Sequence, residues 1–137
     1  MNIKTLVLTF GLALAGMAAT LNAQQQKTAI YVHCENNPED SVGTRFCTDF
    51  RDRIAISPRY RISATEENAI RIGLVTLPDS AGVGTAISSV ATIQKSGDFL
   101  VLLVGQYVQT CGSQRTYECA GSLLSSLDQD VQKLFQK

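Results

Sequence analysis

The spacing of apolar residues changes along the chain and predicts where its helices and strands lie. Residues 27–34 are mostly apolar and rich in Ile, Val and Tyr, which is typical of a strand. From Val42 to Ile54 apolar side chains recur at helical spacing, which predicts a helix with one buried stripe. Asn37 is the candidate cap of this helix, with Pro38 just inside it, and the helix is expected to end before Pro58.

A period of two follows this helix and predicts four further strands. We expect them at residues 60–64, 69–77, 85–94 and 99–110, separated by a polar turn at 66–68, a Gly/Ser/Asp loop at 78–84 and a hairpin turn at 95–98. Apolar residues return at steps of three and four from Tyr117 to Phe135. This spacing predicts a second helix that runs from about Arg115 to the end of the chain.

The resulting element order is β-α-β-β-β-β-α, with no internal repeat. Hairpins between successive strands, including one that joins 60–64 to 69–77, would make most of the sheet antiparallel, whereas the first helical crossover allows the first two strands to run parallel. Each helix has a single apolar stripe, so both helices are expected on the same face of the sheet. We therefore predict an α+β two-layer sandwich with a mostly antiparallel sheet and both helices on one face.

Residues 1–23 have the pattern of a secretory signal peptide, which is not expected to belong to the fold. Lys4 precedes an apolar stretch, and small residues lead to a workable cleavage site after Ala23. The alternative is a permanent transmembrane anchor, which needs roughly 18 or more apolar residues in a row. The apolar run here is shorter. We expect a single domain at residues 24–137, periplasmic or extracellular, with no membrane span after cleavage.

Charge and composition exclude several classes of function. The chain of 137 residues has 12 Lys+Arg and 12 Asp+Glu, so its formal net charge is zero and it lacks the basic character expected of a protein that binds nucleic acid. Hydrophobic residues make up 45% of the sequence, which is too many for a disordered chain. The single histidine rules out a site built from several histidines. We expect no metal and no cofactor.

Four cysteines in an exported chain predict two disulfides rather than free thiols. Cys34 and Cys111 each end a strand, and Cys47 and Cys119 each lie early in the helix that follows. We expect the two strand ends to lie at opposite ends of the sheet, which favours the local pairs Cys34–Cys47 and Cys111–Cys119. The crossed pairing, Cys34–Cys111 with Cys47–Cys119, remains the alternative.

Side chains that could support catalysis are few. His33 is adjacent to Cys34, but oxidation would remove the thiolate that a Cys–His pair needs, and neighbours on a strand point to opposite faces. A structural or surface histidine is therefore favoured. Adjacent or near-adjacent acids occur as Glu39/Asp40, Glu66/Glu67 and Asp128/Asp130, in turns and on polar helix faces where capping and solubility explain them.

Arginines are concentrated in the middle of the chain and are the first candidate for partner binding. A shared surface would suit an unknown protein or an anionic envelope component. The simpler explanation is that nearby acids, among them Asp49 and Glu66, neutralise the arginines locally. The candidate residues are Arg45, Arg53, Arg59, Arg61 and Arg71.

The segment 111–119 is the second candidate for binding. If a disulfide closes it, Arg115 and Tyr117 would lie on a rigid loop, and both are residue types favoured at interfaces. The alternative for Tyr117 is a core position, because it also falls on the apolar stripe of the second helix.

The polar side chains Ser88, Thr92, Gln94, Gln106 and Gln109 predict a mixed sheet face that no helix covers. The leading hypothesis is a non-enzymatic envelope protein that binds a partner, or a second copy, through this face. An inhibitor of a cell-wall hydrolase acting through 111–119 is the alternative, and a small hydrolase using His33 is third.

Overall fold

Residues 26–80, 82–94, 97 and 100–136 are described by a computed structural model. The expected signal peptide lies outside these residues. The element order is the predicted one: β1 (Thr28–Asn36), α1 (Ser41–Ile56), β2 (Tyr60–Ile62), β3 (Ile70–Ser80), β4 (Gly84–Gln94), β5 (Val101–Gly112) and α2 (Thr116–Phe135). Within the described part of the chain, neither helix is long and apolar enough to cross a membrane.

The five strands form one mixed sheet in the order β2-β1-β3-β4-β5. β1 is parallel to both of its neighbours, and the two antiparallel ladders, β3 with β4 and β4 with β5, are the longer ones. The expected hairpin between β2 and β3 is wrong, because β1 lies between them. Ile30 of β1 is fully buried and pairs with Ile62 on one side and Ile70 on the other, so β1 contributes to the core as an interior strand of the sheet.

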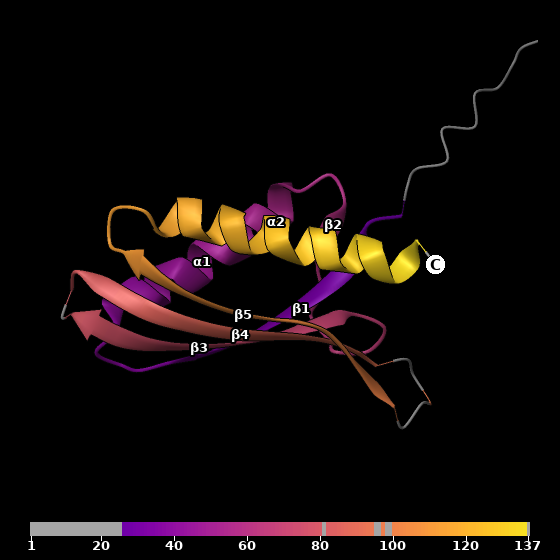
Figure 1. The fold of residues 1–137 in the computed structure, drawn as a ribbon, viewed down its shortest axis with the longest axis horizontal. Coiled ribbons are helices and arrows are strands. Elements are labelled where there is room, and N and C mark those ends of the chain that lie inside the picture. The colour runs from indigo at the N-terminus through magenta and orange to yellow at the C-terminus, as the bar shows by residue number, and fades with distance from the viewer. Residues whose placement is uncertain (1–25, 81, 95–96, 98–99, 137) are drawn as a thin grey trace, which may run out of the picture.

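Both helices cover the same face of the sheet, as predicted, and pack against each other (Figure 1). The core between the two layers includes Phe46 and Phe50 of α1, whose rings stack with centroids 6.2 Å apart, and Leu127 of α2. The other face of the sheet carries no helix among the described residues, and we call it the open face. In Figure 1 the first residues of β5 bend away from α2.

The start of α1 differs from the expectation. β1 continues to Asn36, and the helix begins later than expected, with Asp40 rather than Asn37 as its cap. Asp40 is only 1% exposed, and its carboxylate accepts hydrogen bonds from the Gly43 amide (2.7 Å) and the Thr85 hydroxyl of β4 (2.6 Å). One side chain therefore caps the helix and joins it to the sheet.

The two disulfides have the expected local pairing, Cys34–Cys47 and Cys111–Cys119, with Cα atoms 6.6 and 6.2 Å apart. Their expected placement at opposite ends of the sheet is wrong. β1 and β5 run in the same direction, so Cys34 and Cys111 lie toward the same end. Each disulfide joins the end of a strand to the helix that follows it, and both helices start at this end.

Candidate functional site

The open face is the side of the sheet that neither helix covers among the described residues. Strand register places alternate residues of β1, β3, β4 and β5 on it. Large apolar side chains are exposed over its β3–β5 half: Val75, Leu77, Val90, Leu103 and Val108. Ser88, Thr92 and Gln106 lie between them, so the mixed character expected from the sequence is present. Exposed apolar groups gathered on one face are typical of an interaction surface.

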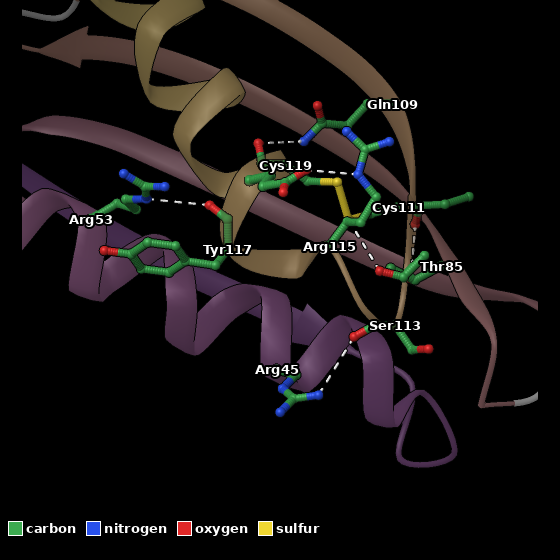
Figure 2. The surroundings of a disulfide bond; sticks show 12 residues. Arg45, Arg53, Thr85, Gln109, Cys111, Ser113, Arg115, Tyr117 and Cys119 are labelled. Carbon is green, nitrogen blue, oxygen red and sulfur yellow. Dashed lines mark hydrogen bonds and ion pairs between the residues drawn. A yellow bond between two sulfur atoms is a disulfide. The ribbon is translucent and has the colours of Figure 1, made fainter.

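Gln109 is the exception among the polar residues assigned to this face. Its side chain points toward α2, where its amide donates to the Cys119 carbonyl at 3.3 Å (Figure 2). The reason is the period of two: Cys111 must face the helices to reach Cys119, so Gln109 faces them as well. The assignment of Gln109 to the open face was therefore wrong.

The charged part of the open face lies over β1, β2 and the start of β3. His33 and Glu35 are exposed neighbours, with Nε2 and Oε1 3.3 Å apart. Arg71 pairs with Glu66 at 3.0 Å. Arg61 is exposed and lies at the β2 edge, opposite Ala29 of β1. This half of the face therefore carries both signs of charge beside the apolar half.

The remaining arginines of the predicted patch lie on the helix side instead. Arg45 approaches the Ser113 carbonyl at 3.5 Å, and Arg53 donates to the Tyr117 carbonyl at 3.2 Å (Figure 2). Arg59 forms an ion pair with Asp128 at 2.8 Å. All three contact α2 or the segment that leads into it. The structure therefore divides the five arginines between two sides of the sheet and does not bring them together.

Tyr117 lies on α2 beside α1 and is about half exposed. The guanidinium carbon of Arg53 is 3.7 Å from its ring centroid, which is a cation–π contact. Gly121, one turn further along α2, leaves room for Arg53, since a Cβ there would lie 3.2 Å from the guanidinium group. Tyr117 is thus part of the seam between the helices rather than of the buried core.

The closed segment 111–119 is shorter as a loop than the sequence suggested. Only residues 113–115 lie between β5 and α2, and the rest of the disulfide ring belongs to these two elements. Arg115 is exposed, but its side chain bonds to Glu118 at 2.7 Å. Arg115 and Tyr117 point to different neighbours, so the structure does not join them in one site.

A groove of about 510 Å³ runs between the end of α1 and the middle of α2. Its size is in the range of small-molecule pockets. The polar groups on its wall are bonded to each other: Asp128 accepts hydrogen bonds from Arg59 and from the Tyr60 hydroxyl, at 2.8 and 2.7 Å. These groups stabilise the contact between β2 and α2 and leave few free donors for a ligand.

This network changes the acidity of its members. Burial and the hydrogen bond to Asp128 raise the pKa of Tyr60 above its ordinary value. Burial also acts to raise the pKa of Asp128, but the hydrogen bonds from Tyr60 and Arg59 outweigh it and hold the pKa below the usual carboxyl value. Tyr60 is therefore a neutral donor and Asp128 a charged acceptor near neutral pH.

Neither His33 nor the cysteines form a nucleophilic pair. Cys34 is bonded to Cys47, and His33 is on the opposite face of β1 with its ring beside Glu35. Among the described residues, no three His, Cys, Asp or Glu side chains gather in an arrangement that could hold a metal ion.

The exposed apolar residues of the open face were not predicted from the sequence. Residues 73–77 carry apolar side chains on both faces of the strand. Leu74 is buried against the helices, and Val75 is exposed on the open face. An interior strand with apolar side chains on both of its faces indicates either that both faces are covered or that one apolar face is exposed. The apolar side chains of the open face could therefore have been predicted from the sequence.

Comparisons with known proteins identify no family. No protein-family model matches the chain, and no curated protein does. A solved structure, the hypothetical protein CT253 from Chlamydia trachomatis, matches with a TM-score of 0.39 and 11% identity, over 63% of this chain and 72% of that chain. A likeness at this level carries no argument about fold or function.

Proposed function

We propose that this chain is a non-enzymatic, exported bacterial binding or accessory protein of the cell envelope, which docks another protein on its open face. One observation carries the proposal: large apolar side chains are exposed together on the side of the sheet opposite both helices. Two disulfides support export, because such bonds persist in oxidising compartments.

The chemistry of the face defines the partner. Val75, Val90 and Val108 offer an apolar centre, and Arg61 adds a positive charge at the β2 edge. The partner should therefore present an apolar surface with an acidic group at one margin. Interfaces of this kind combine a buried apolar centre with a polar rim.

The proposal can be tested by crosslinking in intact bacteria that export the chain. A photoreactive side chain at Val90 samples the open face, and one at Asp52, exposed on α1, is the matched control. We expect a discrete adduct with a different envelope protein from position 90 and none from position 52. The double substitution Val75→Asp and Val108→Asp should abolish this adduct without unfolding the chain.

Three outcomes would overturn the proposal. They are no adduct from position 90, an adduct that survives the two aspartates, or an adduct that contains only a second copy of this chain. The unfolding transition of the double variant, measured in parallel, separates loss of docking from loss of fold.

Inhibition of a cell-wall hydrolase through segment 111–119 is the alternative, supported by the disulfide that closes the segment and by the exposure of Arg115. Inhibition that is unchanged in Arg115→Ala and Tyr117→Ala would exclude it. A small hydrolase using His33 is the third proposal, and retained hydrolysis in His33→Ala would exclude that one.

A further inference from the structure

We propose that two copies of this chain associate through the outer edge of β5, which joins their sheets into one continuous sheet. The sheet order makes β5 an edge strand of 12 residues. Strand edges present unpaired backbone N–H and C=O groups, and natural proteins commonly protect them with lysine, proline or a short strand. β5 has none of these, and neither β4 nor β5 contains a charged residue.

The direction of the backbone groups follows from one hydrogen bond. The Ser113 amide donates to the Val83 carbonyl at 2.8 Å, one step beyond the paired residues Gly84 and Gly112. Bonding and non-bonding positions alternate along an antiparallel pair. Cys111, Gln109 and Tyr107 therefore direct their backbone groups toward β4. The residues between them direct theirs outward: Gln106, Val108 and Thr110.

A bulge limits the length of straight edge that is available. The pairing of β4 with β5 shifts between Ala91 and Thr92, which leaves Val104 as the extra residue on β5. The regular part of the edge therefore runs over residues 105–111, and Val108 is its central residue. Its side chain is 83% exposed.

This stretch is complementary to itself in the antiparallel direction. A two-fold axis at Val108 places the valine opposite its own copy and Gln106 opposite Thr110 of the other copy. The outward backbone groups of all three residues then pair with those of the other copy. An apolar side chain lies opposite an apolar one, and polar side chains lie opposite polar ones. Both edges are uncharged, so no repulsion opposes the pairing. These features favour a second copy over a strand from an unrelated protein.

The association would also extend the open face. Residues 106, 108 and 110 carry side chains on the open face and have outward-directed backbone groups, so pairing brings the two open faces side by side. The inference goes beyond the docking function proposed above and does not depend on it.

Sedimentation velocity on the full chain with intact disulfides tests the inference, over a roughly hundredfold dilution series that covers micromolar affinities. Two substitutions at one position separate the edge from the face. Val108→Pro keeps an apolar side chain but removes the outward N–H, whereas Val108→Thr keeps the N–H and loses apolar surface. We expect Val108→Thr to form the wild-type dimer and Val108→Pro to remain monomeric at every concentration.

Gln106→Lys is the second variant, needed if Val108→Pro fails to fold. It retains the backbone N–H and adds a charge at the edge. We expect it to raise the concentration needed for dimer formation at least tenfold. Three results would overturn the inference: a wild-type chain that is monomeric throughout, a dimer that survives both Val108→Pro and Gln106→Lys, or a dimer lost in Val108→Thr but kept in Val108→Pro. The last result would place self-association on the open face.

Discussion

Tyr60 and Asp128 lie 68 positions apart in the sequence, and the tyrosine hydroxyl donates a 2.7 Å hydrogen bond to the carboxylate. Tyr107 makes the same contact with Asp130 at 2.9 Å. The two tyrosines belong to β2 and β5, the two edge strands of the sheet, and the two aspartates are on opposite sides of α2. A hydrogen bond from a tyrosine hydroxyl to an aspartate carboxylate therefore links α2 to each edge strand of the sheet.

Removal of one of these hydroxyls should lower stability. A hydrogen bond to a charged group contributes about 1.5–3 kcal/mol, and Asp128 keeps its bonds from Arg59 and Gln132 in Tyr60→Phe. We expect the free energy of unfolding to fall by about 1–2 kcal/mol in urea titrations. Tyr31→Phe is the matched control, because this β1 tyrosine has no side-chain hydrogen bond among the described residues. An equal loss in both variants would show that the Tyr60 bond contributes nothing.

The same bonds predict a dependence of stability on pH. Hydrogen bonds from Lys133 and Tyr107 lower the pKa of Asp130, as those from Tyr60 and Arg59 lower the pKa of Asp128. A depressed folded-state pKa contributes stability that is present above the unfolded value, 3.8 here, and is lost as the pH falls through the folded value.

We therefore expect the wild-type chain to lose stability below about pH 4. The double variant Asp128→Asn and Asp130→Asn should be less stable than wild type at pH 7, and the difference should shrink at pH 3. Thermal unfolding of both chains at the two pH values measures this. A difference that stays constant between pH 7 and pH 3 would contradict the assignment.

Local pattern was sufficient for the elements and the two-layer arrangement, whereas the disulfide pairing was predicted correctly from a wrong placement of the two strand ends. The spacing from Val42 to Ile54 predicts α1 because a buried stripe needs helical periodicity, and the cysteines pair locally because each disulfide spans one strand-to-helix turn. The order of the strands was not accessible in this way. β2 has three residues, too few for its own pattern to indicate whether it pairs with β1 or β3.

The candidate site was predicted less well, for a related reason. Arg45, Arg53 and Arg59 are close in sequence to Arg61, but Arg45 and Arg53 are on α1. Whether they share a surface with Arg61 depends on which side of the sheet α1 covers and on which face of β2 Arg61 lies. The contact of Arg59 with Asp128 is set by the position of β2 at the edge, which long-range packing decides. The apolar half of the open face, in contrast, could have been predicted from the alternation of side chains along the strands alone.

A close approach of α1 to the sheet makes one glycine essential. A Cβ at Gly43 would collide with the Thr76 hydroxyl and the Asp40 carboxylate, which lie beneath the first turn of α1. We expect Gly43→Ala to cost about 1–3 kcal/mol, although alanine favours a helix by about 1 kcal/mol. Gly73→Ala is the control, since a Cβ there meets nothing within 4 Å. Chemical denaturation of both variants measures the effect, and a neutral Gly43→Ala would rule out the collision.

The disulfides should contribute similar amounts because they close loops of similar length. The sequence separations are 13 for Cys34–Cys47 and 8 for Cys111–Cys119. Loop-closure entropy gives about 3 and about 2.5 kcal/mol for these spans. We expect the paired substitutions Cys34→Ala/Cys47→Ala and Cys111→Ala/Cys119→Ala to lower the free energy of unfolding by these amounts, with the first pair losing slightly more because it closes the longer loop. Urea unfolding under non-reducing conditions measures both. A far larger loss for the second pair would mean that this bond holds the contact between β5 and α2, and not only the loop.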